Sequence, residues 1–156
     1  MKSCELKLGR FFGVTFEHGK DFFEELNLFC KENNVKQAFI PMFIAGFSEA
    51  EMVGTCDKVE NPQAPIWSKV YLEYVDVVGS GTISYDESNQ KILPHIHVSV
   101  GVKTQSSVAY TSHLISAKVL FLSEMLVIEV ISPKMTRAVN PDLFNISLLS
   151  FLGGNE

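Results

Sequence analysis

One segment of this chain has the spacing of an amphipathic helix, and β-branched and aromatic residues dominate the rest. Within residues 20–33, the apolar residues recur at steps of three and four, which lines one helical face: Phe22, Phe23, Leu26, Phe29 and Cys30. A sheet needs such a face to cover its core side. The pattern predicts an α+β fold: a mostly antiparallel sheet with one long helix over residues 20–33, packed on it by Phe22, Leu26 and Phe29.

The strands follow from period-two alternation and from apolar runs between turn residues. In the apolar run 37–47, Pro41 indicates a bulge or a sheet edge. Gly79-Ser80-Gly81 predicts a kink or bulge between two strands. A turn is expected at 86–89, a loop at 61–65, and further strands at 4–10, 12–17, 70–78, 82–85, 91–100, 108–119, 125–131, near Arg137 and at 145–151.

The length of 156 residues fits a single domain over residues 1–156. An apolar share of 46%, with 12 Phe, can form a core without help and excludes a disordered tail. Three cysteines without a C-x-x-C spacing argue against a disulfide framework and fit a reducing compartment. Neither a signal-peptide core nor a run long enough for a membrane helix is present. We therefore expect a soluble, cytoplasmic protein with no membrane partner.

The charge balance weighs against nucleic acid as an unassisted partner. Thirteen Lys and Arg stand against 18 Asp and Glu, a net charge of -5, and only Arg10 and Arg137 carry guanidinium groups. Binding to phosphate backbones is driven by cationic side chains that release counterions. We expect no specific binding to duplex DNA and at most a weak, salt-sensitive association.

The histidines carry the clearest chemical signal. In residues 94–100 (Pro-His-Ile-His-Val-Ser-Val), alternation places His95 and His97 on one strand face. If the hairpin that follows is centred on Gln105, His97 lies opposite His113, at a Cβ separation of roughly 4.5–5.5 Å. Three converging imidazoles can bind Zn²⁺ with bonds of roughly 2.0–2.1 Å and leave a fourth position open. The pattern predicts a metal site at His95, His97 and His113.

A simpler interpretation stays open beside the metal site. A histidine pair two residues apart on a strand is also common as an ordinary half-exposed polar face. Imidazole ligands suit zinc, copper, iron and nickel alike, so the residues do not identify the ion. The remaining histidine, His18, follows Glu17 and precedes a glycine. We interpret it as a surface loop residue.

The order of these features resembles the plant and prokaryote conserved (PPC) domain, a family that accompanies AT-hook motifs in plant nuclear proteins and stands alone in prokaryotes. The resemblance covers about residues 6–149. It rests on an N-terminal strand ending in Arg10, a helix after Gly19, and four later motifs: Ile44-Ala45-Gly46-Phe47, Glu73 ahead of Gly79-Ser80-Gly81-Thr82-Ile83-Ser84, Pro94-His95-Ile96-His97-Val98-Ser99-Val100, and His113-Leu114.

The resemblance implies an antiparallel sheet flanked by a helix, a homotrimer, and a metal ion, zinc, held by His95, His97 and His113. It also implies an association with DNA. The chain departs from the family pattern in two ways. Thr111-Ser112 stands where the family has Gly-Gly before the third histidine, and no AT-hook is present, as in the stand-alone prokaryotic type.

Two functions follow as hypotheses. The first is a metal-binding, trimeric module with a binding or regulatory role. The alternative is a small zinc-dependent enzyme, because an open zinc position lowers the pKa of bound water to about 7. Such an enzyme needs a general acid or base near the metal. The candidate is Glu73, which the resemblance places in a ligand-binding role. Whether the open metal position is catalytic, and which small-molecule ligand or partner it serves, stays open at the level of sequence.

Overall fold

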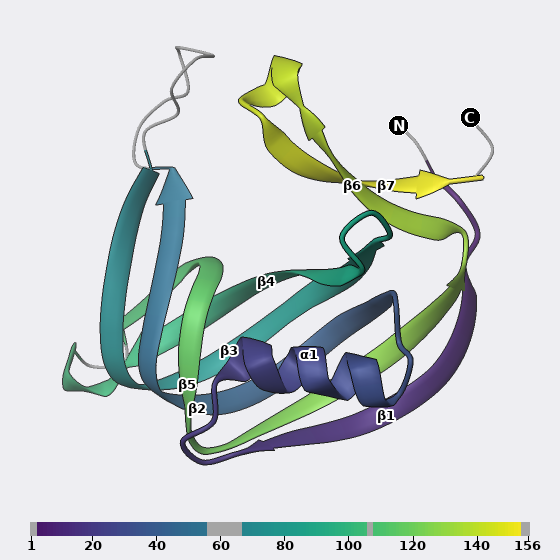
Figure 1. The fold of residues 1–156 in the computed structure, drawn as a ribbon. Helices are drawn as coiled ribbons and strands as arrows, with labels where there is room; N and C mark the ends of the chain where they lie inside the picture. The colour runs from purple at the N-terminus through teal and green to yellow at the C-terminus, as the bar shows by residue number, and fades with distance from the viewer. Residues whose placement is uncertain (1–2, 56–66, 106–107, 154–156) are drawn as a thin grey trace.

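The computed structural model describes residues 3–55, 67–105 and 108–153, so the loop expected at 61–65 lies outside the described residues. Over these ranges the chain is mostly antiparallel β-structure with one short α-helix (Figure 1). In chain order the elements are β1 (Lys7–Glu17), α1 (Phe22–Glu32), β2 (Ala38–Thr55), β3 (Trp67–Asp86), β4 (Lys91–Val102), β5 (Val108–Ser132), β6 (Lys134–Asn140) and β7 (Ile146–Leu152), with short 3₁₀ turns at Lys103–Gln105 and Pro141–Leu143.

A five-stranded sheet in the order β1-β5-β2-β3-β4 forms the body of the fold. Strand β4 also pairs with the first part of β5, so the sheet closes on itself like a barrel. This closure is possible because β5 is 25 residues long. Its first part, from Val108 to His113, pairs with β4, and its last part, from Leu122 to Ser132, pairs with β1.

The separate strands expected at 108–119 and 125–131 are therefore one strand. Between the two parts, Phe121 has a left-handed φ of 65° and the register against β2 shifts between Ala45 and Gly46. A bulge of this kind bends a strand without ending it. The strands expected at 4–10 and 12–17 likewise form the single strand β1, with register shifts between Lys7 and Phe11.

Pro41 lies at a bulge, as the sequence predicts. The register of β2 shifts between Ile40 and Phe43 against β3. Because proline cannot donate to a ladder, a central strand accommodates it at such a bulge. Gly79-Ser80-Gly81 does not separate two strands, since β3 continues through these residues. The irregularity at this point of the ladder is the bulge in β2, because Ile40 pairs with Gly81 and Phe43 pairs with Gly79. Gly79 makes room for a side chain, since a β-carbon there would clash with the ring of Phe43.

Helix α1 is shorter than the long helix expected over residues 20–33. Asp21 caps its start, where Oδ1 accepts hydrogen bonds from the backbone N–H groups of Phe23 and Glu24, both at 2.9 Å. Asn34 follows its end with a left-handed φ of 52°, the exit that the Asn33-Asn34 pair favours. In the described part of the chain, no helix combines the length and apolar character needed to cross a membrane.

The predicted face of α1 packs against the sheet. Phe22 and Leu26 are fully buried, and Phe29 makes an edge-to-face contact with Phe12 of β1, with ring centroids 5.2 Å apart. Phe22 also lies within 5.6 Å, between ring centroids, of three phenylalanines on the strands: Phe16, Phe43 and Phe47. The helix thus contributes the centre of an aromatic core that includes side chains from β1 and β2.

The hairpin formed by β6 and β7 is a separate two-stranded sheet, and Gln37 attaches it to the body of the fold. The Gln37 amide nitrogen donates to the carbonyls of Val130 at 3.0 Å and Pro133 at 2.9 Å, while its oxygen accepts from the N–H of Met135 at 2.8 Å. Met135 is fully buried. The start of β6 is therefore held in place against the end of β5.

Two leucines on α1 test this packing with the same substitution. Leu26 is fully buried, whereas Leu28 is 45% exposed. We expect Leu26→Ala to lower the free energy of unfolding by about 2–5 kcal/mol, because it leaves a cavity in the core. Leu28→Ala should change it by about 0.5 kcal/mol or less. Urea denaturation at one protein concentration measures both, and equal losses in the two variants would contradict the packing described here.

Candidate metal centre

Strand β4 places His95 and His97 on the outer face of the barrel. Ile96, Val98 and Val100 are fully or almost fully buried, so the alternating positions between them point outward. His97 is exposed and His95 is half-buried. The two imidazole rings lie side by side, with centroids 5.0 Å apart.

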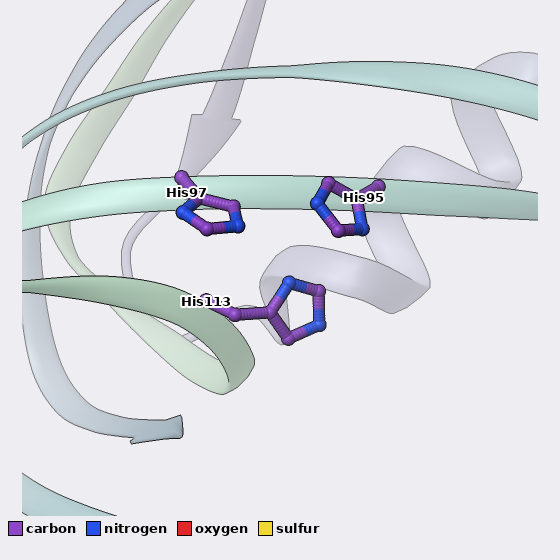
Figure 2. Close-up of side chains that lie close together, drawn as sticks. All are labelled: His95, His97 and His113. Atoms are coloured by element: carbon purple, nitrogen blue, oxygen red, sulfur yellow. The ribbon is translucent and has the colours of Figure 1, made fainter. Parts of the chain in front are cut away.

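Strand β5 brings the third histidine beside them. His97 pairs directly with His113 in the β4–β5 ladder, the register that a hairpin centred on Gln105 predicts. The His113 ring centroid lies 4.7 Å from that of His95 and 5.5 Å from that of His97. Figure 2 shows the three rings turned toward one another, two from β4 and one from β5. One nitrogen from each ring lies within 4.8 Å of those of the other two.

The donor set fits a metal ion. The Nδ1 atom of His113 is buried and has no hydrogen-bond partner among the described residues. Buried polar atoms in proteins nearly always have a partner, and an ion would supply one. A tetrahedral ion with bonds of roughly 2.0–2.1 Å holds its ligand atoms about 3.4 Å apart. Small side-chain rotations would therefore bring these nitrogens to ligand distance.

The electrostatics keep the cluster ready to bind a cation, because a metal binds the neutral imidazole. Burial lowers the pKa of His95 from 6.5 to about 4, and the positive charges of Arg137, His113 and His97 contribute in that order. Burial also lowers the pKa of His113, followed by the charges of His97 and Arg137. Both rings are therefore neutral at pH 7.

The strand accommodates the departure from the Gly-Gly pattern at Thr111-Ser112. The Ser112 hydroxyl donates a hydrogen bond to the Val53 carbonyl on β2, and the Thr111 hydroxyl donates to that of Ser99 on β4 at 3.1 Å. Gly54 supplies the space, since a β-carbon there would lie 2.7 Å from Ser112 Oγ. The two side chains therefore fit without displacing His113 from its register.

Arg137 lies beside the histidines, and the sequence analysis did not place it there. Its Nη2 donates to the Thr82 hydroxyl at 2.8 Å, and Thr82 pairs with His95 in the β3–β4 ladder. Arg137 comes from β6, in a hairpin that folds back onto β3 from far along the chain. The number of residues between Arg137 and the histidines in the sequence does not predict this contact.

Glu73 lies elsewhere. It is exposed on β3 and pairs with Glu49, seven positions along the strand from Ser80, the residue opposite His97. Regular alternation would place Glu73 on the same face as Val75 and Val77, which are buried. The alternation breaks at Tyr74, which has a left-handed φ of 53°. Among the described residues, the group of possible metal ligands consists of the three histidines and does not include Glu73.

His18 lies in the turn after β1, as expected of a surface loop residue, and it is exposed. Its Nδ1 accepts a hydrogen bond from the N–H of Phe121 at 3.1 Å.

Comparison with known proteins agrees with this architecture. The family model described as the Plants and Prokaryotes Conserved (PCC) domain matches residues 4–131. A presumed DNA-binding protein of Bacteroides thetaiotaomicron is 25% identical, with a TM-score of 0.74 over 97% of this chain and 98% of the other. A metal-containing protein of Archaeoglobus fulgidus is 24% identical, with a TM-score of 0.78 over 96% and 99%.

A plant- and prokaryote-conserved (PPC) protein of Pyrococcus horikoshii is 19% identical, with a TM-score of 0.78 over 97% of this chain and 99% of the other. At such low identity, the Archaeoglobus and Pyrococcus structures establish a likeness of fold. No curated protein matches the sequence significantly.

The lowered pKa of His95 predicts how the metal-free protein responds to acid. The unfolded chain takes up a proton at this histidine near pH 6.5, whereas the folded chain does so only near pH 4. Between these values the unfolded state binds more protons, so the free energy of unfolding should fall as the pH drops from about 6.5 to about 4. Urea denaturation across this range measures the slope.

Other groups titrate in the same window, so the comparison is between variants. We expect His95→Gln to flatten the slope, because this variant lacks the imidazole whose pKa burial lowers. An equal slope in the wild type and in His95→Gln would show that burial of His95 does not couple to folding.

Proposed function

We propose that this chain, because it belongs to the Plants and Prokaryotes Conserved (PCC) domain family, is a metal-binding module with a binding or regulatory role. One observation carries the proposal: a nitrogen from each of His95, His97 and His113 lies within 4.8 Å of those of the other two, on two neighbouring strands. We propose zinc as the ion, since three neutral imidazoles with an open fourth position are a common zinc ligand set. The Archaeoglobus relative, a metal-containing protein, supports the binding of a metal ion without identifying it.

His95, His97 and His113 would hold the ion, and the ion would supply a Lewis-acidic position that accepts an exchangeable ligand. The protein's own contribution is a rigid site: two ligands come from consecutive outward positions of β4, and the third is fixed by the β4–β5 register. A site on paired strands holds its ligands more firmly than a site on loops.

The geometry favours a binding module over a zinc-dependent enzyme. A hydrolytic site needs a general acid or base within hydrogen-bond reach of the reacting group. Glu73, the sequence candidate, lies seven positions along β3 from the residue opposite His97. The histidine group found in the described ranges contains no carboxylate.

DNA association is the weaker part of the family analogy for this chain. The Bacteroides relative is a presumed DNA-binding protein. This chain has a net charge of -5, and of its two arginines, Arg10 is paired with Glu129 at 2.7 Å. The negative net charge opposes the approach of a phosphate backbone. We therefore propose that the module acts on a small ligand or a protein partner.

We also propose that the chain assembles as a homotrimer. An apolar stripe, defined here as Leu126, Met42, Ile44 and Val78, crosses the outside of β5, β2 and β3. Leu126 pairs with Met42 and Ile44 pairs with Val78, while Phe43 between them points into the core. The stripe side chains are 37% to 60% exposed. A contiguous exposed patch of this kind marks a contact surface, and closed symmetric assemblies cover such patches.

Metal analysis of the purified protein tests the site. We expect about one zinc ion per chain after dialysis, and a loss of affinity of roughly tenfold or more in His97→Ala, because one of three ligands is removed. His18→Ala is the matched control, since it removes an imidazole in the exposed turn, and it should bind as the wild type does. Full occupancy in His97→Ala would overturn the proposed site.

Light scattering with size-exclusion chromatography tests the assembly. The wild type should have about three times the mass of one chain. Ile44→Lys should shift it toward the monomer, because a charge would be buried in the interface. Leu28→Lys, which places the same charge on the exposed side of α1, should leave the mass unchanged. A monomeric wild type over a wide concentration range would refute the trimer.

A further inference from the structure

The positive charge of Arg137 is not matched by a carboxylate in the described part of the chain. Burial alone lowers the pKa of this half-buried guanidinium, and no acidic group contributes. Arg10 differs, since Glu129 accepts from its Nε and Nη2, both at 2.7 Å. A charge removed from water is costly unless it is paired. Arg137 is therefore suited to bind an anion.

The position of Arg137 is well defined. Its Nη2 donates to the Thr82 hydroxyl at 2.8 Å and its Nη1 donates to the Ser147 carbonyl at 3.2 Å. Its Nε is buried and has no partner among the described residues. A guanidinium has five N–H donors in a planar fork. Two are used by these neutral oxygens, so the remaining donors can hold a further acceptor.

The surroundings of Arg137 are cationic or neutral. Thr82, to which it donates, lies opposite His95 in the ladder. The charged groups that act on His95 are Arg137, His113 and His97, and those that act on His113 are His97 and Arg137. With a divalent ion on the histidines, the site would hold two positive centres. Opposite charge from a ligand is the simplest way to neutralise them.

We propose that Arg137 and the histidine-bound metal together bind a small oxyanion, one of whose oxygens occupies the open metal position while another accepts from the Arg137 guanidinium. This inference rests on the proposed metal site. Carboxylate and tetrahedral oxyanions share the chemistry that both centres recognise. The ligand must reach the outer face of β4, where His97 is exposed, and must also contact Arg137 of β6.

The experiment replaces zinc with cobalt, whose visible absorption reports a change of ligand. Wild-type protein and variants are loaded with Co²⁺ and titrated with acetate or sulfate at constant ionic strength. We expect saturable spectral changes in the wild type, and an anion affinity at least about tenfold weaker in Arg137→Gln, because a charge-assisted hydrogen bond is lost. Lys91→Gln loses the same charge from an exposed position on β4 and should match the wild type.

The two proposals fail in different ways. If wild-type protein binds no cobalt, the proposed function fails. If it binds one ion per chain and Arg137→Gln binds acetate and sulfate as tightly as the wild type does, the anion site is wrong. Should Arg137→Gln not fold, Arg137→Lys replaces it, with the expectation that the charge preserves part of the affinity. Dissociation of the assembly in Arg137→Gln with unchanged anion affinity would assign the charge to a subunit contact and overturn the inference.

Discussion

The pairing of β5 with three other strands is the constraint on which the structure depends. Its last part joins β1, its first part joins β4, and β2 lies along both. An antiparallel sheet with a free β4 edge would stay open, whereas the β4–β5 ladder closes it. Closure removes two sheet edges and encloses the aromatic core beneath α1. The same ladder sets His113 opposite His97, so the strand pairing that closes the sheet also brings the three histidines together.

The two arginines lie in different electrostatic environments. Arg10 donates to both oxygens of Glu129 and to the Asn33 carbonyl, which ties β1 and β5 to the end of α1. The Arg10 guanidinium holds the pKa of the Glu129 carboxyl below its usual value. Arg137 is held by neutral oxygens instead, beside imidazoles. A paired charge stabilises the fold locally, whereas an oriented and unmatched one is suited to bind a ligand.

Membership of the PCC family is compatible with the changed residues around the third histidine. Ser112 and Thr111 carry side chains in place of glycines, and each donates a hydrogen bond to a neighbouring strand. Gly54 across the ladder from them leaves the space that Ser112 needs. The space that the family's glycines would leave on β5 is supplied here by Gly54 on the neighbouring strand β2. A site is preserved through such a change when the register, rather than the identity of each neighbour, sets the position of the ligand.

Local pattern alone determined the features that depend on near neighbours in the chain. Period-two alternation placed His95 and His97 on one face, and three- and four-residue spacing identified the buried face of α1. A hairpin assumed to be centred on Gln105 predicted the pairing of His97 with His113, which the β4–β5 ladder has. The tertiary structure decided what depends on distant contacts. It joined two expected strands into a bent β5 and kept Glu73 away from the histidines. It also carried Arg137 to Thr82, because a hairpin's docking site is set by packing that no local spacing encodes.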